Sequence, residues 1–240
     1  MLDTFAGIGG FSYAATKLVG GYRTTQFIEI DPFCQKILKK HFPFTPIHDD
    51  IRTFTAIPGQ YDVICGGFPC QSISVAGNRA GITEESRSGI FYELMRVIRM
   101  VRPRFVVLEN VAAILNNGLD IVLGELSQAG YDAEWSVISA SSLGACHRRS
   151  RWWCVATLTN SHSKGLQREN FSKMEREIWA KSSSRRLNPD WRSYVSKPIL
   201  RRGDDGLSYR VDRTKALGNS VVPQVAAIPL KRVHDLYYNE

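Results

Sequence analysis

The chain of 240 residues lacks the features that send a protein into a membrane or an oxidising compartment. No apolar run approaches the roughly 18 residues of a membrane-spanning helix. No basic stretch followed by an apolar one opens the sequence, so we expect no secretory signal. The five cysteines are odd in number and irregularly spaced, which argues against a disulfide framework and a zinc site. We therefore expect a cytoplasmic protein.

Acidic residues are scarce in the second part of the chain. Residues 141–240 hold 19 Lys and Arg against 9 Asp and Glu, whereas residues 1–140 hold 12 against 14. This uneven charge indicates a polyanionic partner, although a basic surface can also serve solubility alone. Hydrophobic residues make up 43% of the sequence, enough for the core of one domain with a small appendage.

Strand-like and helix-like segments alternate over residues 1–157, a pattern typical of an α/β fold with a parallel sheet and helices on both faces. Asp31-Pro32 forms an N-cap followed by proline at the first helical position. The alternation breaks over 158–200, which is rich in Ser, Asn, Arg and Lys, and order returns at 212–227. The expected strands are 2–5, 25–30, 61–65, 105–109, 134–138 and 152–157, and the expected helices are 11–19, 32–41, 88–101 and 119–129.

The pair Pro69-Cys70 follows a hydrophobic stretch that ends in two glycines. Proline fixes the backbone one residue before the thiol. Loops at the carboxyl ends of strands face the ligand crevice in open α/β sheets. The pattern indicates a nucleophilic Cys70, and the alternative is a buried core cysteine beside a turn.

Acidic residues follow several of the predicted strands. Glu29 lies about 20 residues beyond the glycine loop 5–10, where nucleotide-binding folds place a carboxylate on ribose hydroxyls; alternatively it is a surface acid. Asp50, next to Ile51, can accept a hydrogen bond from an adenine amino group or cap a helix. Glu109 ends an apolar run, so desolvation would raise its pKa and favour proton donation; the alternative is a salt bridge at the sheet rim.

Two arginines, Arg149 and Arg151, lead into an apolar strand. Alternate residues of an extended chain point to one face, so we expect both guanidinium groups together. Two fork-shaped donors suit a phosphate or a planar base edge, although a solvated strand start fits as well. The segment 216–223, read alone, predicts only a turn before a helix.

Taken in order, these segments closely resemble the DNA (cytosine-5)-methyltransferase family of bacteria and phages. The resemblance covers 2–151 and 212–227, and implies a Rossmann-like S-adenosylmethionine-dependent methyltransferase sheet with a small, mostly irregular target-recognition region. The segments that match family motifs are 3–10 for the cofactor, 67–71 for the nucleophile, 109–111 for the acid, and Arg149, Arg151 and 218–221.

The resemblance also implies how the chain is divided. Residues 1–157 would form the catalytic and cofactor-binding domain. Residues 158–205 would form a target-recognition region that is short for the family, and 206–240 would return to the catalytic domain. His147 stands where many members carry Gln.

For the site, the resemblance implies S-adenosylmethionine as the cofactor and no metal. Cys70 would attack carbon 6 of a flipped-out cytosine, Glu109 would act at ring nitrogen 3, and Arg149 and Arg151 would hold the base and nearby phosphate. The implied cofactor-binding residues are Phe5, Ile8, Gly10, Glu29, Ile30, Asp50, Ile51, Pro69, Ile90, Asn219 and Val221.

The implied partner is double-stranded DNA, in restriction-modification or phage DNA protection. A cognate restriction endonuclease is a further expected partner, and the protein is expected to be a monomer. Three alternatives stay open: a transfer RNA cytosine-5 methyltransferase, a catalytically inert DNA-binding relative, and a Cys hydrolase. The catalytic residues argue against the inert relative, and no motif places a His as a base for Cys70.

Overall fold

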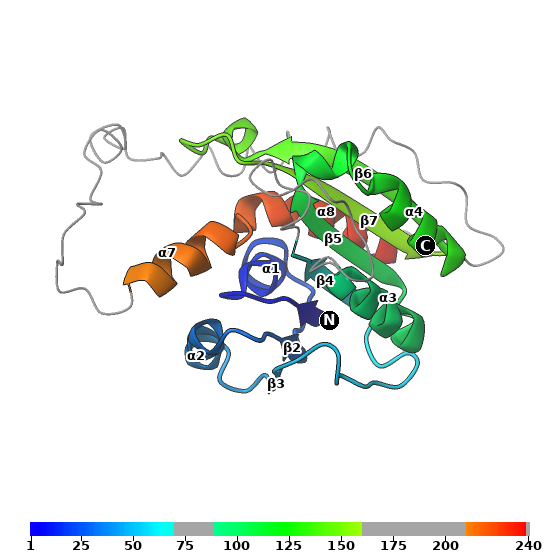
Figure 1. Cartoon of the computed structure of the whole chain (residues 1–240), viewed down its shortest axis with the longest axis horizontal. Coiled ribbons are helices and arrows are strands. Elements are labelled where there is room, and N and C mark those ends of the chain that lie inside the picture. Colours follow the sequence, from blue (N-terminus) through cyan, green and yellow to red (C-terminus); the bar gives the residue numbers. More distant parts are fainter. Residues whose placement is uncertain (70–88, 160–209, 239–240) are drawn as a thin grey trace.

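The computed structural model describes residues 1–69, 89–159 and 210–238, which contain one seven-stranded sheet (Figure 1). The strands lie in the order β3-β2-β1-β4-β5-β7-β6. The strand order reverses between β1 and β4, and open α/β sheets bind ligands at such a switch point. The strands are β1 (Leu2–Thr4), β2 (Gln26–Ile28), β3 (Ile47–His48), β4 (Val63–Gly67), β5 (Phe105–Val111), β6 (Tyr131–Ser139) and β7 (Ser150–Leu158).

The sheet is parallel from β3 to β5 and antiparallel beyond. β7 pairs antiparallel with both β5 and β6. The expectation of a parallel sheet is therefore confirmed for the first five strands and wrong for β7. The physical reason is the short connection over residues 140–149, because adjacent strands joined without a long crossover run antiparallel.

The helices agree closely with those expected from the sequence. α2 (Pro32–His41) has the expected bounds, because Asp31 caps it by accepting hydrogen bonds from the N–H groups of Phe33 and Cys34. The turn expected over 216–223 is shorter than predicted, because a helix (Arg210–Asn219) that the sequence did not predict extends to Asn219, and the next helix begins at Pro223. The remaining helices are α1 (Gly10–Tyr13), which continues as a π-helix (Ala14–Val19), α3 (Ile90–Val101), α4 (Leu119–Gln128), α7 (Arg210–Asn219) and α8 (Pro223–Tyr238), with 3-10 turns at Ala112–Leu115 and Ala140–Leu143.

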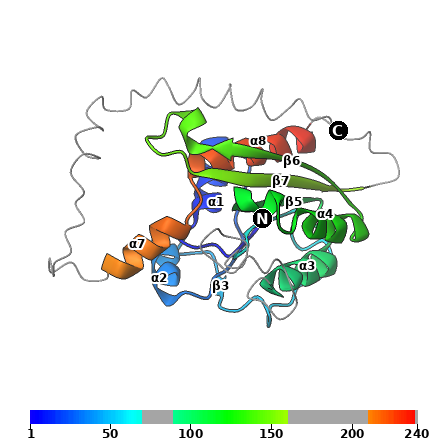
Figure 2. The same ribbon diagram turned by 45° about the horizontal axis from the view of Figure 1, so that its top comes forward.

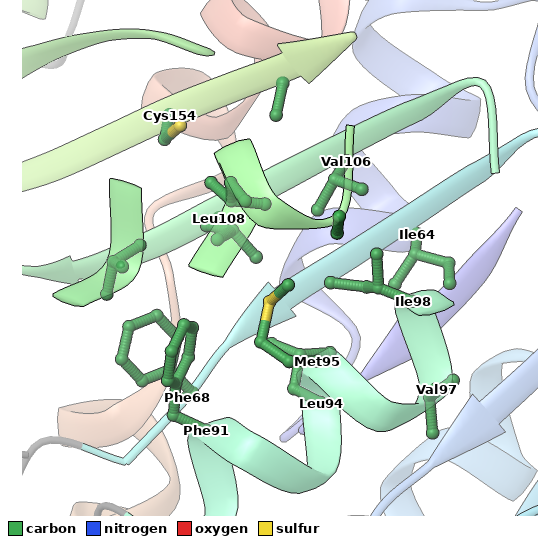
Figure 3. Packing of buried hydrophobic residues seen from close by; sticks show 14 of the residues in the cluster. Ile64, Phe68, Phe91, Leu94, Met95, Val97, Ile98, Val106, Leu108 and Cys154 are labelled. Carbon is green, nitrogen blue, oxygen red and sulfur yellow. The ribbon is translucent and has the colours of Figure 1, made fainter. Parts of the chain in front are cut away.

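Helices cover both faces of the sheet, and β5 shows how its sequence serves the two layers. Val106 and Leu108 pack in the core with α3 and α4, whereas Phe105 and Val107 pack in the core with α1 and α8. This alternation follows from the period of two along a strand. Leu94, Met95 and Ile98 of α3 are fully buried against the first of these surfaces (Figure 3).

The segment α7–α8 returns to the sheet from the far end of the chain. α8 packs in the core with α1, while α7 extends beside α2 away from the sheet (Figures 1 and 2). The expected boundaries at 157 and 206 fall near the ends of the described ranges, and most of 158–205 lies outside them. No helix in the described residues is long and apolar enough to cross a membrane.

Candidate active site

A cavity of about 580 Å³ lies at the carboxyl ends of the central parallel strands. Its volume falls within the range of small-molecule sites, roughly 300–1,000 Å³. Most of the residues predicted from the sequence line this cavity, although they come from distant parts of the chain. They are Phe5, Glu29, Ile30, Asp50, Ile51, Pro69, Ile90, Glu109, Arg149, Arg151 and Asn219.

Three predicted cofactor residues, Ile8, Gly10 and Val221, instead line a neighbouring groove of about 930 Å³. A Cβ atom added at Gly10 would lie 2.6 Å from Cγ2 of Val221. The glycine loop and the turn before α8 therefore pack together beside the cavity and the groove. Cys70 lies outside the described residues, but Pro69 directly before it lines the cavity.

The loop after β1 needs unusual backbone angles to reach α1. Phe5 has a φ of 53° and Gly9 a φ of 88°, in the left-handed region. A Cβ atom at Gly9 would also lie 2.8 Å from the ring of Phe42, so only glycine fits there. The loop thereby turns between β1 and the start of α1 while Phe5 lines the cavity.

Glu29 follows β2 and is 8% exposed. Its Oε2 accepts a hydrogen bond of 2.6 Å from the N–H of Gly7, and Oε1 accepts one of 2.8 Å from the N–H of Asp31. Burial raises the pKa of Glu29, while these backbone bonds oppose the rise. A carboxylate has about four acceptor positions, so this fixed group can still accept bonds from hydroxyl groups.

Asp50 and Ile51, which follow β3, also line the cavity. Both carboxylate oxygens of Asp50 accept hydrogen bonds from the Arg52 guanidinium, which lowers the pKa of Asp50 and keeps it an acceptor. From α3, Arg96 donates to the carbonyl oxygens of Ile51 at 2.6 Å and Phe54 at 3.1 Å. No sequence pattern indicates Arg96, since only the fold brings α3 beside this turn.

Glu109, near the end of β5, is a second buried acid of the cavity and is 9% exposed. Its Oε1 lies 3.1 Å from Nε of Arg151. Burial raises the pKa of Glu109 to about 7, against the opposing charges of Arg151 and Arg149. A carboxyl group with this pKa can give or accept a proton near neutral pH.

Asn110 is a buried cavity residue for which the sequence predicts no role of its own beyond the acid motif 109–111. It is 2% exposed, and its Nδ2 donates a hydrogen bond of 3.3 Å to the carbonyl oxygen of Phe68. The end of β5 is thereby tied to the loop that leads to Pro69. Glu109 and the residue before Cys70 are thus held in one arrangement.

Arg149 departs from the extended backbone expected for it, with a φ of 29°. That expectation is wrong, because β7 begins at Ser150. The Nη2 of Arg149 donates to the carbonyl oxygens of Gly218 at 2.8 Å and Ser220 at 2.7 Å. Nearby, Lys215 of α7 donates a 3.0 Å hydrogen bond to Asp31 across the cavity.

This fold is shared with solved structures of methyltransferases. A putative DNA modification methyltransferase encoded within an E. coli prophage aligns over 100% of this chain and 99% of its own, with a TM-score of 0.62 and 18% identity. The Dnmt2 methyltransferase of S. pombe aligns over 75% of this chain and 53% of its own, with a TM-score of 0.57 and 20% identity. The chain therefore has a Rossmann-like methyltransferase fold.

The family follows from the sequence comparisons. Residues 1–202 match the model of the C-5 cytosine-specific DNA methylases, and the chain belongs to this family. It is 37% identical over 158 residues to the Type II methyltransferase M.CviJI of Paramecium bursaria Chlorella virus IL3A, over 65% of this chain and 42% of the relative. It is 30% identical over 222 residues to the Type II methyltransferase M.MspI of Moraxella sp, over 88% of this chain and 51% of the relative. The chain thus spans about half the length of these relatives or less.

Proposed function

We propose that the chain transfers a methyl group from S-adenosylmethionine to carbon 5 of a flipped-out cytosine in duplex DNA. The observation that carries this proposal is the pairing of Glu109 with Arg151 in the cavity that also holds Glu29. A buried acid whose pKa is about 7 suits proton donation to a ring nitrogen. Membership of the family supports the same reaction.

The residues present fit the cofactor. Glu29 would accept hydrogen bonds from the two ribose hydroxyls, because its oxygens are already oriented by backbone N–H groups. Asp50, kept ionised by Arg52, would accept a bond from the adenine amino group. Ile30 is 64% exposed at the cavity and would gain apolar contact with the bound nucleoside. When bound, the cofactor supplies an electrophilic methyl group.

The target base must leave the duplex, because its reacting carbons are inaccessible within the base stack. The Cys70 thiolate would form a bond to carbon 6, while Glu109 donates a proton or hydrogen bond to nitrogen 3. Electron density would then move to carbon 5, which would take the methyl group while the electron pair of the broken carbon–sulfur bond stays with the departing S-adenosylhomocysteine. Loss of the carbon 5 proton to a base re-forms the 5,6 double bond and expels the Cys70 thiolate.

Arg151 would stabilise the substrate side of the same site. Its ion pair with Glu109 sets the position of the acid, and its remaining guanidinium N–H groups can donate to the oxygen of the base or to a phosphate. The excess of 19 basic over 9 acidic residues in 141–240 supports a nucleic-acid partner. The setting we propose is restriction-modification or phage DNA protection, in the cytoplasm.

The test uses duplex DNA that carries 5-fluorocytosine, with S-adenosylmethionine and the purified chain. Fluorine cannot leave carbon 5 as a proton does, so the protein stays covalently attached. We expect a denaturation-resistant protein–DNA band that Cys70→Ser abolishes while its cofactor affinity and melting temperature stay unchanged. An equal band with Cys70→Ser would reject Cys70 as nucleophile. Methyl transfer to transfer RNA but not to DNA would replace the substrate proposal.

A further inference from the structure

Arg149 has a backbone conformation that requires an explanation. Three residues other than glycine have positive φ in the described part of the chain: Phe5, Arg102 and Arg149. Arg102 caps the carboxyl end of α3, and Phe5 belongs to the glycine loop. Arg149 directly precedes β7 and ends no helix. Strained residues that the surrounding structure maintains are often found at functional sites.

The strained backbone places one guanidinium nitrogen between two carbonyl oxygens. Nη2 of Arg149 donates to Gly218 at 2.8 Å and to Ser220 at 2.7 Å. Gly218 lies in the last turn of α7, where carbonyl groups have no partner within the helix. A cation there also complements the partial negative charge of the helix end.

The turn that Arg149 holds is part of the cavity wall. Gly218 and Asn219 line the cavity, while Val221 packs against Gly10 of the glycine loop. The turn therefore contacts both the cavity and the start of α1. A displacement of the turn would move Asn219 and release the loop that carries Phe5.

Resting on the proposed function, we propose that Arg149 is a positioning residue: it fixes the α7–α8 turn as a wall of the cofactor site. A direct contact with base or phosphate is the competing role. That role depends on DNA, whereas the wall must be in place when the cofactor binds alone. The charge of Arg149 also lowers the pKa of Glu109 within the same cavity, so the two effects can be separated by choosing variants that keep or remove the charge.

Two variants make this separation. Arg149→Lys keeps the charge but replaces the planar fork by a shorter-reaching point charge, and Arg149→Met removes both. We measure the Kd for S-adenosylmethionine by calorimetry without DNA, and kcat/KM against pH with duplex DNA. Arg148→Met is the matched control, because Arg148 is the sequence neighbour of Arg149, carries the same charge and has an exposed side chain.

We expect both Arg149 variants to weaken cofactor binding roughly tenfold, since two charge-assisted hydrogen bonds are lost or distorted. The descending limb of the pH profile should keep its midpoint in Arg149→Lys and move to higher pH in Arg149→Met. Arg148→Met should leave the cofactor Kd unchanged. Melting temperatures serve as the check on folding. If the variants only destabilised the fold, their melting temperatures would fall and the midpoint of the pH profile would not differ between Arg149→Lys and Arg149→Met.

An unchanged cofactor Kd in Arg149→Met, together with a raised KM for DNA, would overturn the inference and assign Arg149 to the substrate. A wild-type chain that neither binds the cofactor nor forms the covalent adduct would instead contradict the proposed function. An active wild type with unaffected Arg149 variants contradicts the positioning role alone.

Discussion

Two buried carboxylates, Glu29 after β2 and Glu109 near the end of β5, face the same cavity and are held by different groups. Both oxygens of Glu29 accept backbone N–H bonds of 2.6 and 2.8 Å. Glu109 has instead an ion pair with the side chain of Arg151, at 3.1 Å. Burial raises the pKa of both, and brings that of Glu109 to about 7.

The difference separates binding from chemistry. Backbone N–H groups do not titrate and have fixed directions, so they oppose the rise in the pKa of Glu29 and fix its oxygens for accepting hydrogen bonds. Glu109 is balanced between burial, which favours the neutral acid, and two guanidinium groups, which favour the anion. A carboxyl group so balanced can change its protonation state during a reaction.

Glu109→Gln should produce the largest effect. The amide can donate a hydrogen bond to the base but cannot transfer a proton, so we expect kcat to fall roughly 10²–10⁴-fold. Cofactor affinity should stay unchanged, because Glu29 is intact. Methyl transfer from labelled cofactor to duplex DNA measures the first quantity and calorimetry the second. A loss below threefold would remove Glu109 from the chemical step.

The pH profile sharpens the role of Glu109. Because its folded pKa is about 7, the proton-donor form is present below that pH and disappears above it. We expect kcat/KM to decline as the pH rises through about 7, and the residual activity of Glu109→Gln to lack this limb. A declining limb that persists in the variant would belong to another group that acts in its protonated form.

Glu29→Ala should show the reverse pattern, with a smaller effect. Hydrogen bonds to charged groups contribute about 1.5–3 kcal/mol, so we expect the Kd for the cofactor to rise roughly 10–100-fold. At saturating cofactor, kcat should fall far less than in Glu109→Gln. Each variant thus serves as the control for the other. Equal losses of kcat in both would contradict the separation of binding from chemistry.

The sequence predicted these two acids because each stands at the end of a hydrophobic run, and the carboxyl ends of parallel strands meet at one edge of the sheet. It did not predict the contacts that hold the neighbouring turns of the cavity. Arg149 reaches carbonyl groups at 218 and 220, and Arg96 reaches the turn at Ile51, across separations that no local pattern encodes. The positive φ of Arg149 also breaks the alternation expected with Arg151.

The predicted cofactor residues are divided between the cavity and the adjacent groove, and local sequence patterns do not predict this division either. Glu29, Asp50 and Pro69 line the cavity because they lie in the loops that follow β2, β3 and β4. Ile8, Gly10 and Val221 line the adjacent groove, since Gly10 and Val221 pack against each other. A motif fixes which segments meet, whereas side-chain packing decides which residues of a segment face the ligand.

Lys215→Gln tests the contrast between backbone and side-chain anchoring where we expect the smallest effect. It removes the ion pair between α7 and Asp31. Asp31 follows Glu29 closely and caps α2 through backbone N–H groups, so its anchoring by the backbone survives the loss of Lys215. The lysine side chain is 63% exposed, and solvent screens such pairs. We expect the cofactor Kd to change less than about threefold, and the difference to vanish in high salt. A larger, salt-resistant loss would show that side chains of α7, as well as backbone N–H groups, determine how the cavity holds its ligand.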